Sequence, residues 1–253
     1  MKITFLGTGT SQGIPVIACH CSVCASSDSK DQRLRSAVLI ESKNTTVVID
    51  TGPDFRQQML VNNVQNLDAV VYTHEHKDHV AGMDDVRAFN FKFKRDMPVY
   101  ASKSVQKALK NEFHYVFGST YPGVPQIFFH TIHSESKFKI GDIPFEVIEV
   151  MHHKLKVFAY RIKDLVYITD ANSIDDKQLE KIKGCKILII NGLRKEKHIS
   201  HFNLQQAIDL SKSLQVEQTF LTHISHLMGK HQEVNSELES NVQLAFDGLT
   251  IDF

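Results

Sequence analysis

The chain has 253 residues, of which 42% are hydrophobic and 23% are charged. This is enough apolar material for a sizeable core, and we expect a single domain over residues 1–253. The chain has 29 lysines plus arginines and 29 aspartates plus glutamates. It therefore lacks the overall positive charge that attracts nucleic acid, and nucleic acid is not expected as a partner. Because neither a signal-peptide pattern nor a membrane-spanning run is evident, we expect a cytoplasmic protein without membrane partners.

Apolar runs rich in β-branched residues recur along the chain and predict strands. Several are continuous rather than alternating, which is typical of strands that are covered on both faces. The expected strands are 2–7, 36–42, 45–52, 67–73, 145–151, 165–170, 186–191, 219–223 and 248–253; the expected helices are 53–63, 83–93, 103–116, 173–183 and 203–214. Interleaved strands and helices indicate an α/β or α+β class, with a loop or lid near 118–136.

Residues of the metal-binding type follow several of these strands. His74, His152, Asp170 and His223 each come directly after an apolar run. If the strands share one orientation, their ends lie along one rim, where α/β ligand sites commonly form. We therefore expect these side chains to converge.

The segment "THEHKDH", residues 73–79, concentrates four such donors. In an extended segment His74 and His76 face the same way, while Asp78 and His79 enter the following turn and helix start. Four donors from so short a segment suit two adjacent ions better than one tetrahedral ion. A helical zinc-protease motif would need histidine at position 78, which is aspartate.

The pattern His74-x-His76-x-Asp78-His79, with single metal-type residues after later strands, resembles the metallo-β-lactamase superfamily. The resemblance spans essentially the whole chain. It implies an α/β fold, an αββα sandwich of two mixed β-sheets flanked by helices, with a two-metal site between the sheets. By resemblance, one metal would be held by His74, His76 and His152, the second by Asp78, His79 and His223, and Asp170 would bridge both. Diiron members usually carry glutamate at the position of His76, so histidine favours zinc or manganese.

His153 competes with His152 for the later ligand position, because adjacent residues on an extended segment face opposite ways. The local "HHKL" is similar to a His-x-Lys-Leu pattern of close relatives and favours His152. Asp50, in "VVIDTG", is interpreted as a hydrogen-bond partner of a ligand or as a turn residue.

A second cluster lies in "CHCSVC", where Cys19, Cys21 and Cys24 fall within six residues. This spacing suits a chelating turn around zinc. His20 lies between two of the thiols and would have difficulty turning back to the same ion, whereas His226 in "LTHISH" is better placed as the fourth ligand. Cys185, in "KGCKILII", indicates core packing instead.

"GTGTSQGIP" and "CHCSVC", together with "THEHKDH" and "LTHISH", resemble the PhnP branch of the superfamily. That resemblance implies a structural zinc beside two divalent catalytic ions, zinc or manganese, and a phosphodiesterase that opens cyclic ribose phosphates such as phosphoribosyl 1,2-cyclic phosphate. His201, in "ISHFNLQQ", aligns with a PhnP-type histidine that stabilises or protonates the leaving group, whereas nearby His198 lacks the match. Family members often form dimers, so a homodimer is a possible assembly.

Two adjacent ions would lower the pKa of a shared water, and the resulting bridging hydroxide would attack phosphorus. We expect turnover to depend on His201 and Asp78. Hydrolysis of a thioester or lactone and processing of transfer RNA precursors are alternative activities of the same fold. A non-enzymatic zinc module is a further alternative, but it would need neither Asp78 nor Asp170.

Overall fold

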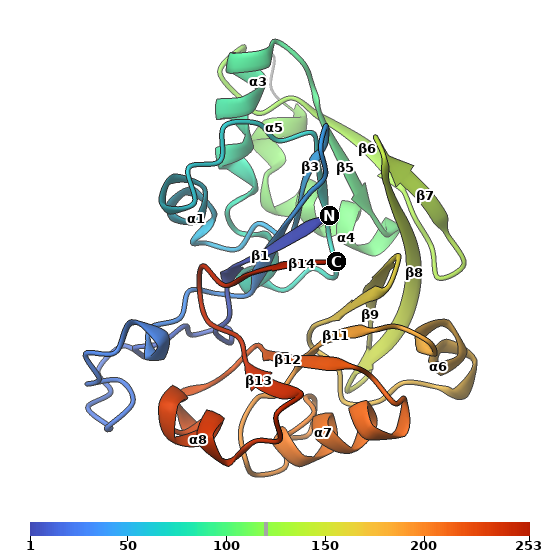
Figure 1. The fold of residues 1–253 in the computed structure, drawn as a ribbon. Helices are drawn as coiled ribbons and strands as arrows, with labels where there is room; N and C mark the ends of the chain where they lie inside the picture. Colours follow the sequence, from blue (N-terminus) through green and yellow to red (C-terminus); the bar gives the residue numbers. More distant parts are fainter. Residues whose placement is uncertain (119–120) are drawn as a thin grey trace.

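A computed structural model describes residues 1–118 and 121–253. In these residues the strands form two seven-stranded sheets (Figure 1). In pairing order, the first sheet contains β14 (Thr250–Asp252), β1 (Lys2–Gly7), β2 (Ala37–Glu41), β3 (Thr46–Ile49), β4 (Ala69–Val71), β5 (Met97–Ala101) and β6 (Ile127–Thr131). The second contains β13 (Val242–Leu244), β12 (Gln218–Thr222), β11 (Ile187–Asn191), β10 (Leu165–Ile168), β9 (Leu155–Ile162), β8 (Ile143–His152) and β7 (Lys137–Ile140).

Both sheets are mixed. Strands β3 to β6 pair in parallel, and β14, β1, β2 and β3 pair antiparallel. In the second sheet β10 to β13 pair in parallel, whereas β7 to β10 pair antiparallel. Because β9 is antiparallel to both of its neighbours, β8 runs in the same direction as β10 and β12, and these three strands end on the same side of the sheet.

The continuous apolar strands are buried on both faces. In β2, Val38 and Ile40 join a core cluster that also contains Phe145 and Tyr160 of the second sheet, whereas Leu39 joins a cluster with helical side chains. This alternation follows from the period of two residues in a strand. One core therefore lies between the sheets and one lies on each outer face, which makes the molecule an αββα sandwich and confirms the predicted fold.

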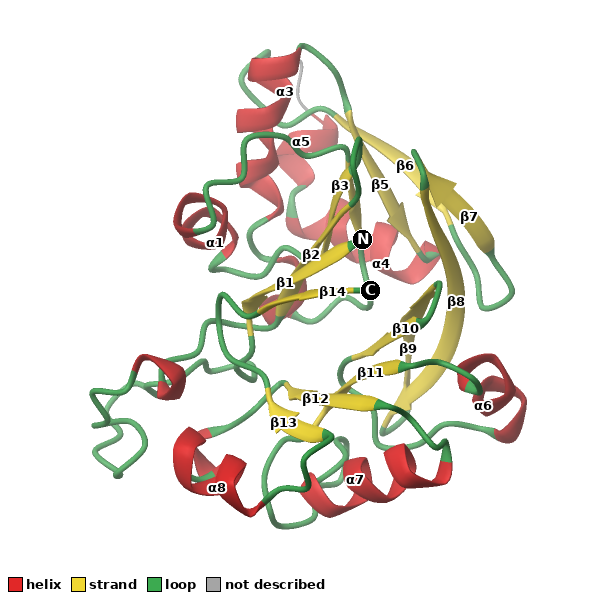
Figure 2. Ribbon diagram, viewed as in Figure 1, coloured by secondary structure: helices red, strands yellow, loops and turns green. Residues whose placement is uncertain are grey.

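Helices cover the outer faces, α1 to α5 on the first sheet and α6 to α8 on the second (Figure 2). Their bounds are α1 (Phe55–Val61), α2 (Lys77–Val80), α3 (Arg87–Phe93), α4 (Lys103–Glu112), α5 (His114–Gly118), α6 (Asp176–Ile182), α7 (Leu204–Ser213) and α8 (His231–Glu237); short 3₁₀ turns are η1 (Ser29–Asp31), η2 (Met83–Val86) and η3 (His226–Met228). Among the described residues, no helix has the length and apolar character needed to cross a membrane.

The nine expected strands and five expected helices each overlap an element of the expected type. The sequence patterns missed β5, β6, β7, β9, β13 and α8. Strand β7 has the sequence "KFKI", in which lysines alternate with apolar residues at an edge of the sheet, and β13 is only three residues long. The expectation of a loop or lid at 118–136 is wrong for 127–131, which forms β6, and its residues 119–120 lie outside the described part.

Residues 11–35, between β1 and β2, form a segment that extends away from both sheets (Figure 1) and is called the cysteine arm below. A buried network holds its base. Arg33 donates to Thr8 Oγ1 at 2.7 Å and to Ala245 O at 2.5 Å, and its Nη2 lies 3.2 Å from His231 Nδ1. The backbone N–H of His231 donates to Asp31 Oδ1 at 2.6 Å. The arm is thereby tied to the start of α8.

Candidate metal centre

The donors predicted from the sequence lie at the ends of strands from both sheets. Figure 1 shows the two sheets whose ends carry them. From the first sheet come His74, three residues after β4, and the α2 segment; from the second come the end of β8 and the turns after β10 and β12. We call the set the His/Asp cluster: His74, His76, Asp78, His79, His152, Asp170 and His223. The expectation that these donors lie along one rim of a sheet is therefore incomplete, because the site joins the ends of strands from two sheets.

The ligand atoms fall into three overlapping groups, and within each group they lie within 4.8 Å of one another. The groups are Asp78, His79, Asp170 and His223; His74, His76 and Asp170; and His152, Asp170 and His201. His152 also lies beside the first histidines, since its ring centroid is 5.2 Å from that of His76. His153 is exposed, so the geometry favours His152 over His153 as the inward-facing residue.

The two carboxylate oxygens of Asp170 face different histidines. Oδ1 lies 3.1 Å from His223 Nε2 and 3.3 Å from His79 Nε2, whereas Oδ2 lies 3.7 Å from His74 Nε2. Two donors bound about 2.1 Å from one tetrahedral ion are about 3.4 Å apart. These spacings are those of ligand pairs around a common ion, and Asp170 can serve two ions at once.

Hydrogen bonds behind the cluster orient two of its rings. His79 Nδ1 lies 2.7 Å from Asp50 Oδ2, and Asp50 Oδ1 accepts the backbone N–H of Thr73 at 2.9 Å. His152 Nδ1 donates to the carbonyl oxygen of Ser200 at 2.7 Å. Each contact directs Nε2 of the ring into the cluster and fixes its tautomer. The sequence predicts for Asp50 either this supporting role or a turn position, and the structure shows both, whereas the carbonyl of Ser200 leaves no signal in a side-chain motif.

The backbone is constrained at the same places. Asp50, Asp170 and His223 have φ values of 67°, 52° and 54°, in the left-handed region that few residues other than glycine adopt. Gly52 allows a close approach between two turns, since a Cβ there would lie 2.2 Å from the carbonyl oxygen of Asp78. These conformations turn the chain sharply at the strand ends and direct the donors inward.

Burial and mutual electrostatics favour the cation-binding form at Asp170 and His74 but not at His79. Burial alone would raise the pKa of Asp170, but His223 and His79 outweigh burial and hold that pKa well below its usual value. Burial lowers the pKa of His74 well below 6.5, and the neighbouring His79 lowers it further. An ionised carboxylate and a neutral imidazole are the states that coordinate a metal. Burial lowers the pKa of His79, but Asp78, Asp170 and Asp50 outweigh burial and hold that pKa well above 6.5, so an ion bound by His79 must displace a proton.

Divalent cations fit this cluster. Among the described residues, His74 Nε2 and His79 Nε2 are buried without a hydrogen-bond partner. A buried polar atom without a partner is costly, and ions held in the two groups of donors would satisfy both nitrogens. Imidazole and carboxylate donors together suit zinc or manganese.

His201 lies beside the cluster on the loop that leads to α7. Its ring centroid is 4.5 Å from that of His152 and 4.9 Å from that of His223. Burial, with a further contribution from His223, lowers the pKa of His201 to about 3. A capping box between Asn203 and Gln206 at the start of α7 fixes the end of this loop. His198 is only partly buried and lies on the outer side of His201, at 5.2 Å between centroids.

The cysteine cluster consists of Cys19, Cys21, Cys24 and His226. The Sγ atoms of the three cysteines lie 3.3, 3.4 and 3.5 Å from His226 Nδ1. Ligands at zinc's usual bond lengths place sulfur and nitrogen about 3.5 Å apart. The backbone N–H of Cys24, followed by His226, lowers the pKa of Cys21 to about 6. His20 is exposed and outside this cluster, whereas Cys185 is buried, which confirms its predicted core position.

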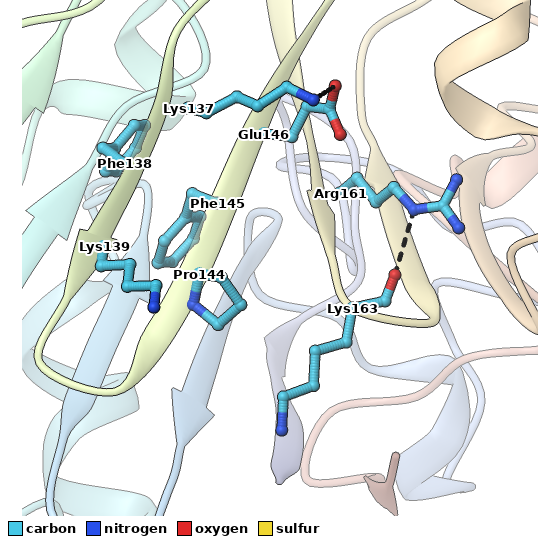
Figure 3. A pocket seen from close by; sticks show the side chains of 8 residues that line it. All are labelled: Lys137, Phe138, Lys139, Pro144, Phe145, Glu146, Arg161 and Lys163. Carbon is cyan, nitrogen blue, oxygen red and sulfur yellow. Dashed lines mark hydrogen bonds and ion pairs between the residues drawn. The ribbon is translucent and has the colours of Figure 1, made fainter.

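A separate recess of about 570 Å³ lies at the other end of the second sheet, lined by Lys137, Phe138, Lys139, Pro144, Phe145, Glu146, Arg161 and Lys163 (Figure 3). Strand β8 lines this recess with Pro144, Phe145 and Glu146 and ends at the cluster with His152. The six steps from Glu146 to His152, at about 3.3 Å each, separate the two by roughly 20 Å. The recess is therefore not part of the His/Asp cluster.

Two layers of sheet between helices, with a His/Asp cluster where strands of both sheets end, define a metallo-β-lactamase-fold hydrolase. A family model described as "Beta-lactamase superfamily domain" matches residues 45–224. The chain therefore belongs to this superfamily.

Within the superfamily, the chain resembles a crystal structure described as a new diphosphatase from the PhnP family. The two are 37% identical with a TM-score of 0.93, over 100% of this chain and 96% of the other. Zinc-bound PqqB from Methylobacterium extorquens is 18% identical with a TM-score of 0.84, over 100% of both chains, and shows the shared fold. The chain thus lies in the PhnP branch.

A curated relative from Porphyromonas gingivalis, named octanoyltransferase, is 38% identical over 252 residues. The match covers 98% of this chain and 51% of the relative, so the chain spans about half of that protein's length.

Proposed function

We propose that this protein is a metal-dependent phosphodiesterase acting on a small phosphorylated substrate, such as a cyclic ribose phosphate. The observation that carries the proposal is the arrangement of Asp170, whose two oxygens face two groups of histidines. The PhnP-family diphosphatase, similar over the whole chain, supports phosphoester chemistry. The balanced charge of 29 basic and 29 acidic residues favours a small substrate over transfer RNA.

In this proposal His74, His76 and His152 would hold one divalent ion, zinc or manganese, and Asp78, His79 and His223 would hold a second. Asp170 would contribute to both sites. The cysteine cluster would hold a third ion, zinc. When bound, two adjacent divalent ions activate water as a nucleophile and neutralise charge on a phosphoryl oxygen. Asp50 and the carbonyl of Ser200 hold His79 and His152 in the ligating orientation.

His201 is assigned to the leaving group. The neutral imidazole keeps one N–H, and its place between His152 and His223 puts it at the edge of the cluster. A hydrogen bond from this ring to the departing oxygen stabilises the alkoxide as the P–O bond breaks, and a water completes the protonation. The residue is thus distinct from the metal ligands in its role.

The test is turnover of bis(p-nitrophenyl) phosphate and of a ribose cyclic phosphate by the metal-loaded protein, beside a thioester and a lactone. Phosphodiester cleavage that needs divalent metal supports the proposal. Acyl hydrolysis without phosphodiester cleavage would overturn it and favour acyl chemistry, the class to which the name of the longer Porphyromonas gingivalis relative belongs.

A paired substitution isolates His201. We expect His201→Ala to lower kcat by about 10² to 10³, the usual cost of removing one hydrogen-bond donor to a developing negative charge, and to leave metal content unchanged. His198→Ala is the matched control, because His198 lies 5.2 Å from His201 but outside the cluster. Equal turnover in the two variants would remove His201 from the reaction.

A further inference from the structure

Asp170 connects the three groups of candidate ligand atoms. Among the described residues it alone belongs to all three groups of ligand atoms. It also has a φ of 52°, so its backbone lies in the left-handed region. A small rotation of the following peptide would redirect the carboxylate away from one group of histidines. Asp170 can therefore serve as a ligand only if contacts with other residues hold this turn in place.

The side chain of Asn191 holds it. Asn191 is the last residue of β11 and is fully buried. Its Oδ1 accepts the backbone N–H of Ala171 at 2.9 Å, and its Nδ2 donates to the carbonyl oxygen of Ala171 at 3.0 Å. Ala171 directly follows Asp170. Two bonds to one residue, on both sides of its Cα, fix the position and the rotation of the chain where it leaves Asp170.

Gly192, the residue after Asn191, connects the end of β11 to the turn after β12. The N–H of Gly192 donates to the carbonyl oxygen of Thr222 at 2.9 Å. Thr222 immediately precedes His223, whose Nε2 lies 3.1 Å from Asp170 Oδ1. The end of β11 thus lies between the turns after β10 and β12 and sets their separation.

We propose that Asn191 is a positioning residue that sets the direction of the Asp170 carboxylate and thereby the affinity of the centre for divalent cations. This inference rests on the proposed function only in taking Asp170 as a ligand. The amide is suited to the task because it offers an acceptor and a donor at once. Aspartate retains only the acceptor when ionised, and alanine retains neither.

Asn90 provides a matched control. It is a buried asparagine on α3, and it makes the same kind of double contact with one residue. Its Nδ2 donates to the carbonyl oxygen of Gln126 at 3.0 Å, and its Oδ1 accepts the N–H of Gln126 at 3.1 Å. Neither residue belongs to a group of candidate ligands. Asn90→Ala therefore removes the same two bonds, and a further one to the carbonyl oxygen of Arg95 at 2.9 Å, from a place without ligands.

The experiment is calorimetric titration of the metal-free protein and its variants with Zn²⁺ and Mn²⁺, together with thermal unfolding. We expect Asn191→Ala to weaken binding to the His/Asp cluster about 10- to 100-fold, as removal of groups that orient ligands does. Asn90→Ala should lower the thermal midpoint and leave affinity within about twofold. In the metal-loaded enzyme, Asn191→Ala should lower kcat more than it raises KM.

If Asn191→Ala does not fold, Asn191→Asp is tested instead. It keeps the bond to the N–H of Ala171 and replaces the donor with a second oxygen. Its added negative charge alone would tighten cation binding, so weaker binding shows the loss of positioning. Unchanged or tighter binding by the folded variant would overturn the proposal and leave Asn191 a structural residue.

The result separates this inference from the proposed function. Weaker metal binding in the Asn191 variant, with no phosphodiester turnover by the unchanged protein, would support the positioning role and refute the substrate class. Unaltered metal binding in a protein that cleaves phosphodiesters would do the reverse.

Discussion

The His/Asp cluster and the cysteine cluster have different architectures. Most residues of the first are buried, and its donors come from strand ends and turns of both sheets. The cysteine cluster takes three donors from a six-residue segment of an extended arm, and Cys21 is exposed. The turn after β12 connects them, because it contributes His223 to one and His226 to the other.

The difference concerns what holds the donors in place. Packed sheets and hydrogen bonds such as that of His79 with Asp50 orient the His/Asp cluster. In the cysteine cluster, the described contacts among the donors are those of Cys19, Cys21 and Cys24 with His226 and with nearby backbone. An ion bound there would contribute to the order of the segment that binds it. We therefore expect catalytic turnover to depend on the His/Asp cluster and the stability of the cysteine arm to depend on the cysteine cluster.

The largest effect is expected from Asp170→Asn, which tests the chemical half of this comparison. Asparagine tolerates the left-handed backbone at φ 52° but lacks the charge that faces both histidine groups. Loss of several kcal/mol of transition-state stabilisation would lower kcat/KM on the order of 10³-fold. Metal analysis should show less metal in the His/Asp cluster and an unchanged cysteine cluster. Full activity would show that Asp170 is not a ligand.

A smaller effect, on stability instead of activity, is expected from Cys21→Ala. It should remove one equivalent of zinc and lower the thermal midpoint, at about 2 to 4 °C per kcal/mol for a chain of this size, while kcat/KM stays within about fivefold. Cys185→Ala is the control, since it removes a buried thiol outside the cluster and should retain the zinc. Metal analysis beside thermal unfolding decides the matter: an unchanged zinc content in Cys21→Ala would contradict the structural site.

The smallest effect concerns pH at the base of the cysteine arm. Burial, followed by the charge of Arg33, lowers the pKa of His231 from 6.5 to about 4. The folded pKa lies below the unfolded one, so this contribution to stability is complete above pH 6.5 and is lost as the pH falls towards 4. Lys30 opposes protonation as well, whereas Asp28 and Asp31 favour it.

His231→Asn sharpens this prediction, because its oxygen can still accept from Arg33 but does not titrate. Urea unfolding followed by circular dichroism at pH 7 and pH 4.5 should show a smaller acid loss in the variant than in the unchanged protein. Identical losses would mean that other groups govern acid sensitivity.

Much of the fold was predictable because its central strands are continuous apolar runs that are buried on both faces. Strand β10 is an example: Leu165 and Tyr167 pack between the sheets, while Val166 and Ile168 pack against the outer helices. Strands with little such signal were missed. Pro98 lies within β5, and the eight residues of β9 follow the two histidines without a recognisable break.

The sequence by itself determined the donors, because ligand chemistry depends on residue type: the spacing of "THEHKDH" and "CHCSVC" and the single residues after later strands are readable without coordinates. Only the tertiary structure decided which groups those donors join and what orients them. The carbonyl of Ser200 behind His152 and the amide of Asn191 behind Asp170 are brought there by sheet pairing. Backbone groups and ordinary asparagines carry no motif, so their roles depend on contacts between residues that are distant in sequence.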